Sequence, residues 1–289
     1  MRKIYGVIEE YAEHNDIIFG ICDADDLDGL NEDITDIPFY NGDFRARISP
    51  DAFLDGAKSI IVLGVKVDWT PIFDGLEQVM APSVCGVDYH KRLRRIADGL
   101  VHKMLEVTNF NFKVQIDSGP LIERAFAIKA GLGFMGKNRC VINHKFGSFF
   151  NIALILVDIK IDNITKNIKL ICNFCNECVM NCPANALSDD GNFDYRRCIS
   201  YLTQKKGDLT EDEVSLMGSS IYGCDICQNV CPHNLGRIER HHRGEANDVL
   251  NKILAMDSEQ FADNFMDSHF FWRGEKTIKR NCLVVLRKL

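Results

Sequence analysis

The segment CNFCNECVMNCP, residues 172–183, spaces four cysteines as C-x2-C-x2-C-x3-C and places a proline directly after the last one. The end of this pattern returns after Cys198 in CDICQNVCP, residues 224–232. Two such runs are typical of bacterial ferredoxins with two [4Fe–4S] clusters, in which the fourth cysteine of a run binds the other cluster. We therefore predict two sets of ligands: Cys172, Cys175, Cys178 and Cys231 for one cluster, and Cys182, Cys198, Cys224 and Cys227 for the other.

Zinc and disulfide bonds are the alternative uses of these cysteines. Zinc sites usually take their ligands as separated pairs, not as a run of three closed by C-P. Disulfides are typical of secreted proteins, but the first residues, MRKIYGVIEEYAEHND, are acidic where a signal peptide needs an apolar stretch. The longest apolar run, residues 149–157, is too short to cross a bilayer. We therefore expect a cytoplasmic protein without a membrane partner, in which Cys22, Cys85, Cys140 and Cys282 are plain buried thiols.

Charge is distributed unevenly along the 289 residues, whose formal net charge is −7. The segment from Glu9 to Asp55 holds 14 acidic residues and two arginines, which leaves 32 basic against 27 acidic residues elsewhere. Because proteins bind nucleic acids through Lys and Arg, an RNA-binding surface stays open. The candidate basic groups lie within residues 91–95, 237–243 and 273–288, although such clusters are more often solvated helix faces.

The residues before the cysteine runs mix helical and strand patterns without a regular βαβ order. Apolar runs predict strands at residues 17–22, 59–67, 112–116, 140–143 and 149–157. Helical spacing predicts a first helix through Ile4, Ile8 and Tyr11, and further helices at residues 88–107 and 121–130. We predict an α+β fold with an α+β domain at residues 1–165, a ferredoxin-like domain at residues 166–235 and a short helical tail at residues 236–289.

Gly131, Gly133 and Gly136 match G-x-G-x-x-G, the fingerprint of dinucleotide-binding folds. That fingerprint follows a strand and opens a helix, whereas here it follows a helical pattern, ERAFAIKA, and precedes an apolar strand. We expect these glycines to permit positive φ or the close approach of a bulky ligand, and we do not expect NAD binding.

Further stretches carry a resemblance to a known family. They are DSGPLIERA at residues 117–125, AGLGFMGKN at 130–138, RCISYLT at 197–203 and IYGCDICQNVCPHN at 221–234. Together they resemble the epoxyqueuosine reductases, and GVDYHK at residues 86–91 fits the same family. The acidic residues before position 55 match poorly, and many members of that family continue into helical repeats that help to hold tRNA.

The resemblance implies a cobalamin-dependent reductase that converts epoxyqueuosine to queuosine at the wobble position of tRNA. It also implies a nitroreductase-like domain that binds base-off cobalamin, and clusters that pass on electrons from an external low-potential donor. Reducing cobalamin to nucleophilic Co(I) needs a strong reductant, and thiolate-held clusters reach potentials as low as about −700 mV. The cofactor then carries the difficult chemistry while the protein orients it.

By the same resemblance, Asp117 is the acid that protonates the departing epoxide oxygen, and the candidate cobalamin contacts are Tyr89, His90, Lys137 and Asn138. Each residue also has an ordinary structural interpretation. An Asp before Ser-Gly-Pro often caps a turn, and an Asp followed by an aromatic residue is a common start of a helix. Lys137 and Asn138 also fit a solvated loop.

Two other functions share the cysteine pattern. One is a related cobalamin and iron–sulfur reductase with another substrate, for which the reductive dehalogenases are the nearest analogy. The other is a non-catalytic two-cluster electron-transfer protein, in which the first domain binds a partner protein and no cobalamin. Cobalamin binding separates the second alternative from both enzymes.

Overall fold

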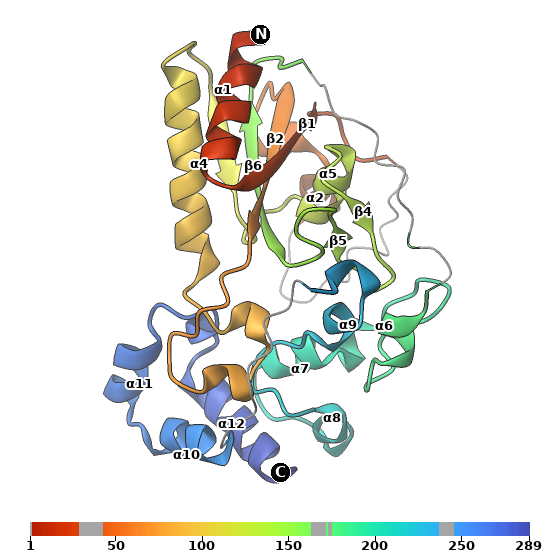
Figure 1. Cartoon of the computed structure of the whole chain (residues 1–289), viewed down its shortest axis with the longest axis vertical. Helices are drawn as coiled ribbons and strands as arrows, with labels where there is room; N and C mark the ends of the chain where they lie inside the picture. Colours follow the sequence, from red (N-terminus) through yellow and green to blue (C-terminus); the bar gives the residue numbers. More distant parts are fainter. Residues whose placement is uncertain (1, 29–42, 163–171, 173–174, 237–245) are drawn as a thin grey trace. The chain divides into compact units, whose positions relative to one another are not determined.

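A computed structural model describes residues 2–28, 43–162, 172, 175–236 and 246–289 (Figure 1). Its contacts divide the chain into two compact units, which we describe separately. The first unit contains residues 1–66, 89–136 and 140–173, and the second contains residues 67–88, 137–139 and 174–289. The predicted domain boundaries near residues 165 and 235 stay a prediction. Within the described ranges, no helix is both long enough and apolar enough to cross a membrane.

An antiparallel sheet of four strands, in the order β1-β2-β6-β3, lies at the centre of the first unit. The strands are β1 (Ile17–Asp23), β2 (Ser59–Lys66), β3 (Phe112–Gln115) and β6 (Phe150–Val157). The register places Ile61 of β2 opposite Ile21 on one side and Ile155 on the other. All four strands were predicted from their apolar runs, and the structure confirms them.

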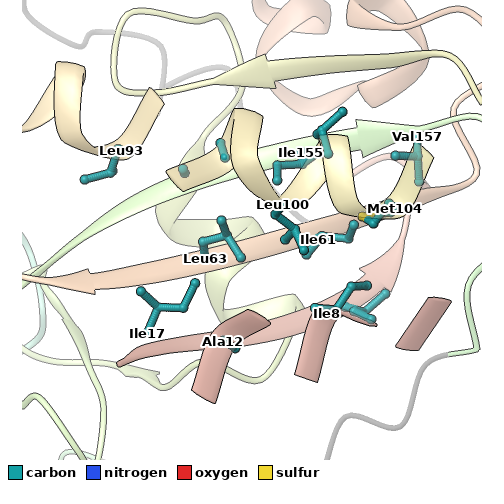
Figure 2. Packing of buried hydrophobic residues seen from close by; sticks show 14 of the residues in the cluster. Ile8, Ala12, Ile17, Ile61, Leu63, Leu93, Leu100, Met104, Ile155 and Val157 are labelled. Carbon is teal, nitrogen blue, oxygen red and sulfur yellow. The ribbon is translucent and has the colours of Figure 1, made fainter. Parts of the chain in front are cut away.

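Helices cover both faces of this sheet. On one face lie α1 (Arg2–His14) and α4 (Tyr89–Leu105), side by side in Figure 1. Figure 2 shows how their apolar side chains meet the strands in a single cluster, which includes Ile8, Ala12, Leu93, Leu100, Met104, Ile61, Leu63, Ile155 and Val157. On the other face, Phe126 of α5 (Glu123–Lys129) belongs to a second cluster with Ile60 and Leu154. Because β2 and β6 are buried on both faces, their sequences are nearly continuous apolar runs.

The glycine-rich loop leads from α5 into a separate two-stranded ladder of β4 (Phe134–Met135) and β5 (Val141–Ile142). Gly131 has a φ of +72°, which a residue with a side chain rarely adopts. A Cβ atom on Gly133 would lie 2.2 Å from the carbonyl oxygen of Ile142. The glycine-rich stretch therefore follows a helix, as predicted, and the strand predicted at residues 140–143 is β5, whereas β4 lies within the stretch itself. Its glycines permit tight backbone packing. Two short helices, α2 (Phe44–Ile48) and α3 (Pro50–Phe53), complete this unit.

The second unit consists of short helices and turns. In chain order its helices are α6 (Glu177–Met180), α7 (Ile199–Gln204), α8 (Glu211–Leu216), α9 (Ile226–Asn229), α10 (Ala246–Ala255), α11 (Ser258–Phe265) and α12 (Glu275–Leu286). Short 3₁₀ turns occur at residues 76–78, 82–84, 195–197, 232–234 and 271–273.

The helices of the predicted tail share one apolar core with residues 67–88. Leu76 and Val79 belong to the same buried cluster as Phe261 and Phe265 of α11 and Ile278 of α12. The cluster also includes Ile221 and Tyr222, which directly precede a cysteine run. The tail is helical, as predicted, and it is also an integral part of the second unit.

Asn281 of α12 provides a test of this integration. Its buried Nδ2 donates hydrogen bonds to the carbonyl oxygens of Thr203 and Ile221, at 2.7 and 2.8 Å. Asn281→Ala leaves both acceptors buried without this donor, so we expect the free energy of unfolding to fall by about 1–3 kcal/mol. Denaturant unfolding followed by circular dichroism measures the change. The exposed Asn251 of α10 is the matched control, and Asn251→Ala should change stability by no more than about 0.5 kcal/mol. Equal stability of the two variants would contradict the assignment.

Candidate functional site

Asp117 lies in the turn between β3 and α5, on the surface of the first unit. Its backbone has a φ of +54°, in the left-handed region that Asp and Asn tolerate better than most residues. The side chain is 64% exposed, so its carboxyl group is open to a ligand. The turn therefore presents a solvent-accessible acid.

Two other predicted site residues lie beside this acid. His90 Nε2 is 3.6 Å from Asp117 Oδ2, and the ring of Tyr89 stacks on the ring of His90 with centroids 4.3 Å apart. Both residues belong to the first turn of α4. The fold thus brings Tyr89, His90 and Asp117 together from separate parts of the sequence. Their roles stay a prediction.

Glu123 belongs to the same site and was not singled out from the sequence. Its Oε1 accepts the backbone N–H of Asp117 at 2.6 Å and the side-chain amide of Gln115 at 3.3 Å. Glu123 is only partly exposed. The desolvation of its carboxyl group, and then the nearby charge of Asp117, raise the pKa of that group to about 7. Its sequence signals were its place at the start of a helix, where an acidic residue is ordinary, and its place within the stretch DSGPLIERA.

Lys137 and Asn138 group with the second unit and contact its cysteine-bearing loops. Lys137 Nζ donates to Asn176 Oδ1 at 2.5 Å and lies 2.6 Å from Asp189 Oδ1. Asn138 Nδ2 donates to the carbonyl oxygen of Cys227 at 3.4 Å. These contacts show that the two residues are not a solvated loop. Their predicted contact with cobalamin stays a prediction.

Three cysteines of the second predicted set lie near one another. Burial raises the pKa of the Cys224 thiol to about 11, and the charges of Cys198 and Cys182 add to the increase. The backbone N–H of Ala186 donates to Cys182 Sγ at 3.3 Å, and the N–H of Ile226 donates to Cys224. Hydrogen bonds to sulfur are one way in which proteins set cluster potentials, so this donor set fits a thiolate-held [4Fe–4S] cluster.

The first predicted set is divided between the two units. Cys172 falls in the first unit, whereas Cys175, Cys178 and Cys231 fall in the second. Cys178 and Cys231 are buried. The buried Asn234 closes the turn after the last of these, because its N–H donates to the carbonyl of Cys231 at 2.9 Å. The exchange of ligands between the two cysteine runs stays a prediction.

Three of the four remaining cysteines are buried thiols, as predicted. Burial raises the pKa of Cys22, Cys85 and Cys282 to about 12, so these thiols stay protonated and unreactive near neutral pH. Cys140 is only partly buried, and the expectation was wrong for this residue.

The three candidate basic groups differ in what they contact. Lys91, Arg92 and Arg95 are exposed on α4, while residues 237–243 lie outside the described residues. In the third group, Arg280 donates to the carbonyls of Lys205 and Leu202, and Arg273 is buried with its guanidinium 3.7 Å from the ring centroid of Trp272. Structural contacts therefore account for Arg280 and Arg273, whereas Lys276 and Arg287 of the third group are exposed, as are the cations of α4.

Proteins of known function are similar to this chain in sequence. Residues 171–234 match the family model of the 4Fe-4S double cluster binding domain. An epoxyqueuosine reductase of Lactococcus garvieae (strain Lg2) is 31% identical to this chain, and the match covers 92% of the chain and 81% of that relative. The chain belongs to the epoxyqueuosine reductase family.

Solved structures of epoxyqueuosine reductases share its fold. One, in complex with a tRNA-Tyr epoxyqueuosine-modified tRNA stem loop, has a TM-score of 0.85 and 29% identity, covering 98% of this chain and 81% of that one. Another, from Bacillus subtilis, has its catalytic aspartate loop swung out of the active site; its TM-score is 0.83 with 29% identity, covering 98% and 82%. The mixed helix-and-sheet fold with a double-cluster domain is therefore that of an oxidoreductase family.

Proposed function

We propose that this chain reduces epoxyqueuosine to queuosine at the wobble position of tRNA. One observation carries the proposal. A chain of this family has a double-cluster segment, and it also has the exposed carboxyl group of Asp117 beside His90. Removing the epoxide oxygen as water breaks two carbon–oxygen bonds and forms a carbon–carbon double bond. This conversion consumes two electrons and two protons, so the enzyme needs both a reductant and an acid.

The clusters supply the electrons in this proposal. Cys172, Cys175, Cys178 and Cys231 hold one cluster, and Cys182, Cys198, Cys224 and Cys227 hold the other. Two observations support the second set: Cys182, Cys198 and Cys224 lie near one another, and backbone N–H groups donate hydrogen bonds to their sulfurs. An external low-potential donor would reduce the clusters, because iron–sulfur clusters pass on electrons that they first receive from a donor.

Cobalamin, bound base-off by a nitroreductase-like first domain, is the second cofactor in the proposal. Bound cobalamin supplies a low-potential cobalt centre for breaking the carbon–oxygen bonds. The residues of the first unit fit a flat macrocycle, because the stacked Tyr89 and His90 rings are partly exposed beside the open Asp117 carboxyl. The proposed cobalamin contacts are Tyr89, His90, Lys137 and Asn138. The side chain of Lys137 also contacts Asn176 and Asp189.

Asp117 donates a proton to the epoxide oxygen as it leaves. An oxygen that departs as hydroxide or water is a far better leaving group than an alkoxide, and a positioned acid typically accelerates such a step about 10²- to 10⁴-fold. His90 Nε2 lies 3.6 Å from this carboxyl, so the turn that carries Asp117 and the first turn of α4 meet at the proposed proton donor.

The substrate is tRNA, and the exposed cations of α4 are its proposed contacts. Lys91, Arg92 and Arg95 offer charges for phosphate oxygens. We place the protein in the cytoplasm, where tRNA and a thiol-reducing environment occur together.

The proposed function is tested on tRNA from cells that lack this activity. Incubation with the cluster-loaded protein, cobalamin and a low-potential reductant should convert the modified nucleoside to a product lighter by one oxygen atom, as measured by mass spectrometry. Omitting cobalamin is the matched control and should abolish the conversion. An unchanged nucleoside mass with both cofactors bound would rule out the proposed function.

A further inference from the structure

The turn that carries Asp117 is closed at its base by a buried amide. Gln115, at the end of β3, donates from Nε2 to the carbonyl of Leu121 at 2.8 Å and accepts the N–H of Leu121 on Oε1 at 3.0 Å. The backbone of Gly119 passes close over this amide, because a Cβ there would lie 2.1 Å from the Gln115 side chain. The chain between Gln115 and Leu121 is therefore held in a compact loop.

Glu123 fastens the start of the same loop. From the first turn of α5 its carboxyl reaches back and accepts the N–H of Asp117 at 2.6 Å. Asp117 has a φ of +54°, a region that non-glycine residues adopt infrequently and that surrounding contacts help to maintain. A hydrogen bond from a backbone N–H to a carboxylate is among the stronger ones in proteins. The Glu123 contact therefore fixes the direction in which the Asp117 side chain leaves the backbone.

The surroundings of Glu123, and not its hydrogen bond to Asp117, disfavour the ionised form of its carboxyl group. Burial and then the Asp117 charge raise the pKa of Glu123 to about 7, while the hydrogen bonds from the Asp117 N–H and from Gln115, and then the charge of His90, oppose this increase. Because the pKa in the folded state lies above the ordinary value of 4.5, the contribution of Glu123 to stability is greatest below that value and is lost as the pH rises through about 7. Replacing the carboxyl group by an amide should therefore stabilise the fold at pH 8. Substitution of a residue that only stabilises the fold would have the opposite effect.

We propose that Glu123 is a positioning residue: by accepting the Asp117 N–H it holds the turn so that the Asp117 acid faces the reacting oxygen. This inference rests on the proposed function of Asp117 and goes beyond it. Gln115 supports the same arrangement through its contact with Glu123 Oε1. A site that sacrifices stability for geometry is typical of catalytic positions.

Hydrogen exchange tests the positioning without any assay of activity. In the full-length, cluster-loaded protein, Glu123→Ala should exchange the Asp117 amide at least about tenfold faster than the wild type, measured by mass spectrometry of peptides that include this amide. Glu123→Gln keeps an acceptor of the same length, so its exchange should stay close to that of the wild type. Glu13→Gln, on an exposed face of α1, is the matched control. Equal protection in all four proteins would overturn the proposal, whether or not the enzyme acts on tRNA.

Kinetics and stability then separate positioning from other roles. Glu123→Ala should lower kcat about 10- to 100-fold with little change in KM for tRNA, because a misplaced acid still allows substrate binding. Glu123→Gln should keep kcat near that of the wild type and have a higher thermal midpoint at pH 8, with the difference vanishing near pH 4. Equal losses of kcat in the Gln and Ala variants would instead make Glu123 a proton donor. A lower midpoint for Glu123→Gln at pH 8 would make it structural, and either result overturns the proposal.

Discussion

Asp117→Asn is expected to lower kcat about 10²- to 10⁴-fold, while clusters, cobalamin and tRNA still bind. Asparagine keeps the shape of the side chain and loses only the transferable proton. It also tolerates the left-handed backbone at this position, where φ is +54°, and its own N–H can still donate to Glu123. The loss should therefore fall on turnover, measured as the single-turnover rate of oxygen loss from tRNA with pre-reduced enzyme.

Two comparisons make this result specific. Asp55→Asn, at an exposed position of the first unit, should leave the rate unchanged. Arg95→Ala, on the exposed face of α4, should weaken tRNA affinity and reduce its salt dependence without slowing the chemical step. If Asp117→Asn deoxygenates tRNA at nearly the wild-type rate, the proton comes from water or another residue.

The predictable part of the fold was the part in which local sequence and burial agree. β2 and β6 are buried on both faces, so their apolar runs identified them, and α4 shows helical spacing because only one face of it meets the sheet. β4 was missed, since two residues in a glycine-rich stretch leave no run to detect. The cysteine runs predicted a double-cluster segment because ligand spacing is set by the cofactor and not by the surrounding fold.

Contacts between residues far apart in sequence were not predictable. Asp225, between two cluster cysteines, accepts the N–H and hydroxyl of Ser83 at 2.9 and 2.7 Å across 142 residues. No local sequence pattern indicates such a pair, so the sequence did not predict that residues 67–88 belong to the second unit. Glu123 was overlooked for a different reason: its partner is a backbone N–H only six residues earlier, but no side-chain motif marks a contact with a backbone group. Motifs identified the residues that carry the chemistry, while the structure identified those that hold them.

Cys198→Ala is expected to reduce the iron content from about eight atoms per chain to about four, because one ligand of the second cluster is lost. Cys198 lies close to Cys182 and Cys224, so the damage should be confined to the cluster that these cysteines share with Cys227. Electrons should then no longer pass from one cluster to the other, and turnover with a chemical reductant should fall to a few per cent or less of the wild-type rate. Iron and sulfide analysis, with electron paramagnetic resonance of the reduced protein, measures the cluster content.

Controls for this prediction come from the cysteines themselves. Cys140→Ala removes a partly buried thiol that belongs to neither predicted set, so it should retain all of the iron and sulfide. Cys175→Ala should remove the other cluster and leave the signal that Cys198→Ala abolishes, because the two sets share no cysteine. Zinc with little sulfide in the wild-type protein would contradict the cluster assignment. If Cys182→Ala abolishes the signal that Cys175→Ala abolishes, and not the one that Cys198→Ala abolishes, the ligands are not exchanged between the runs as the C-P pattern predicts, and the pairing must be redrawn.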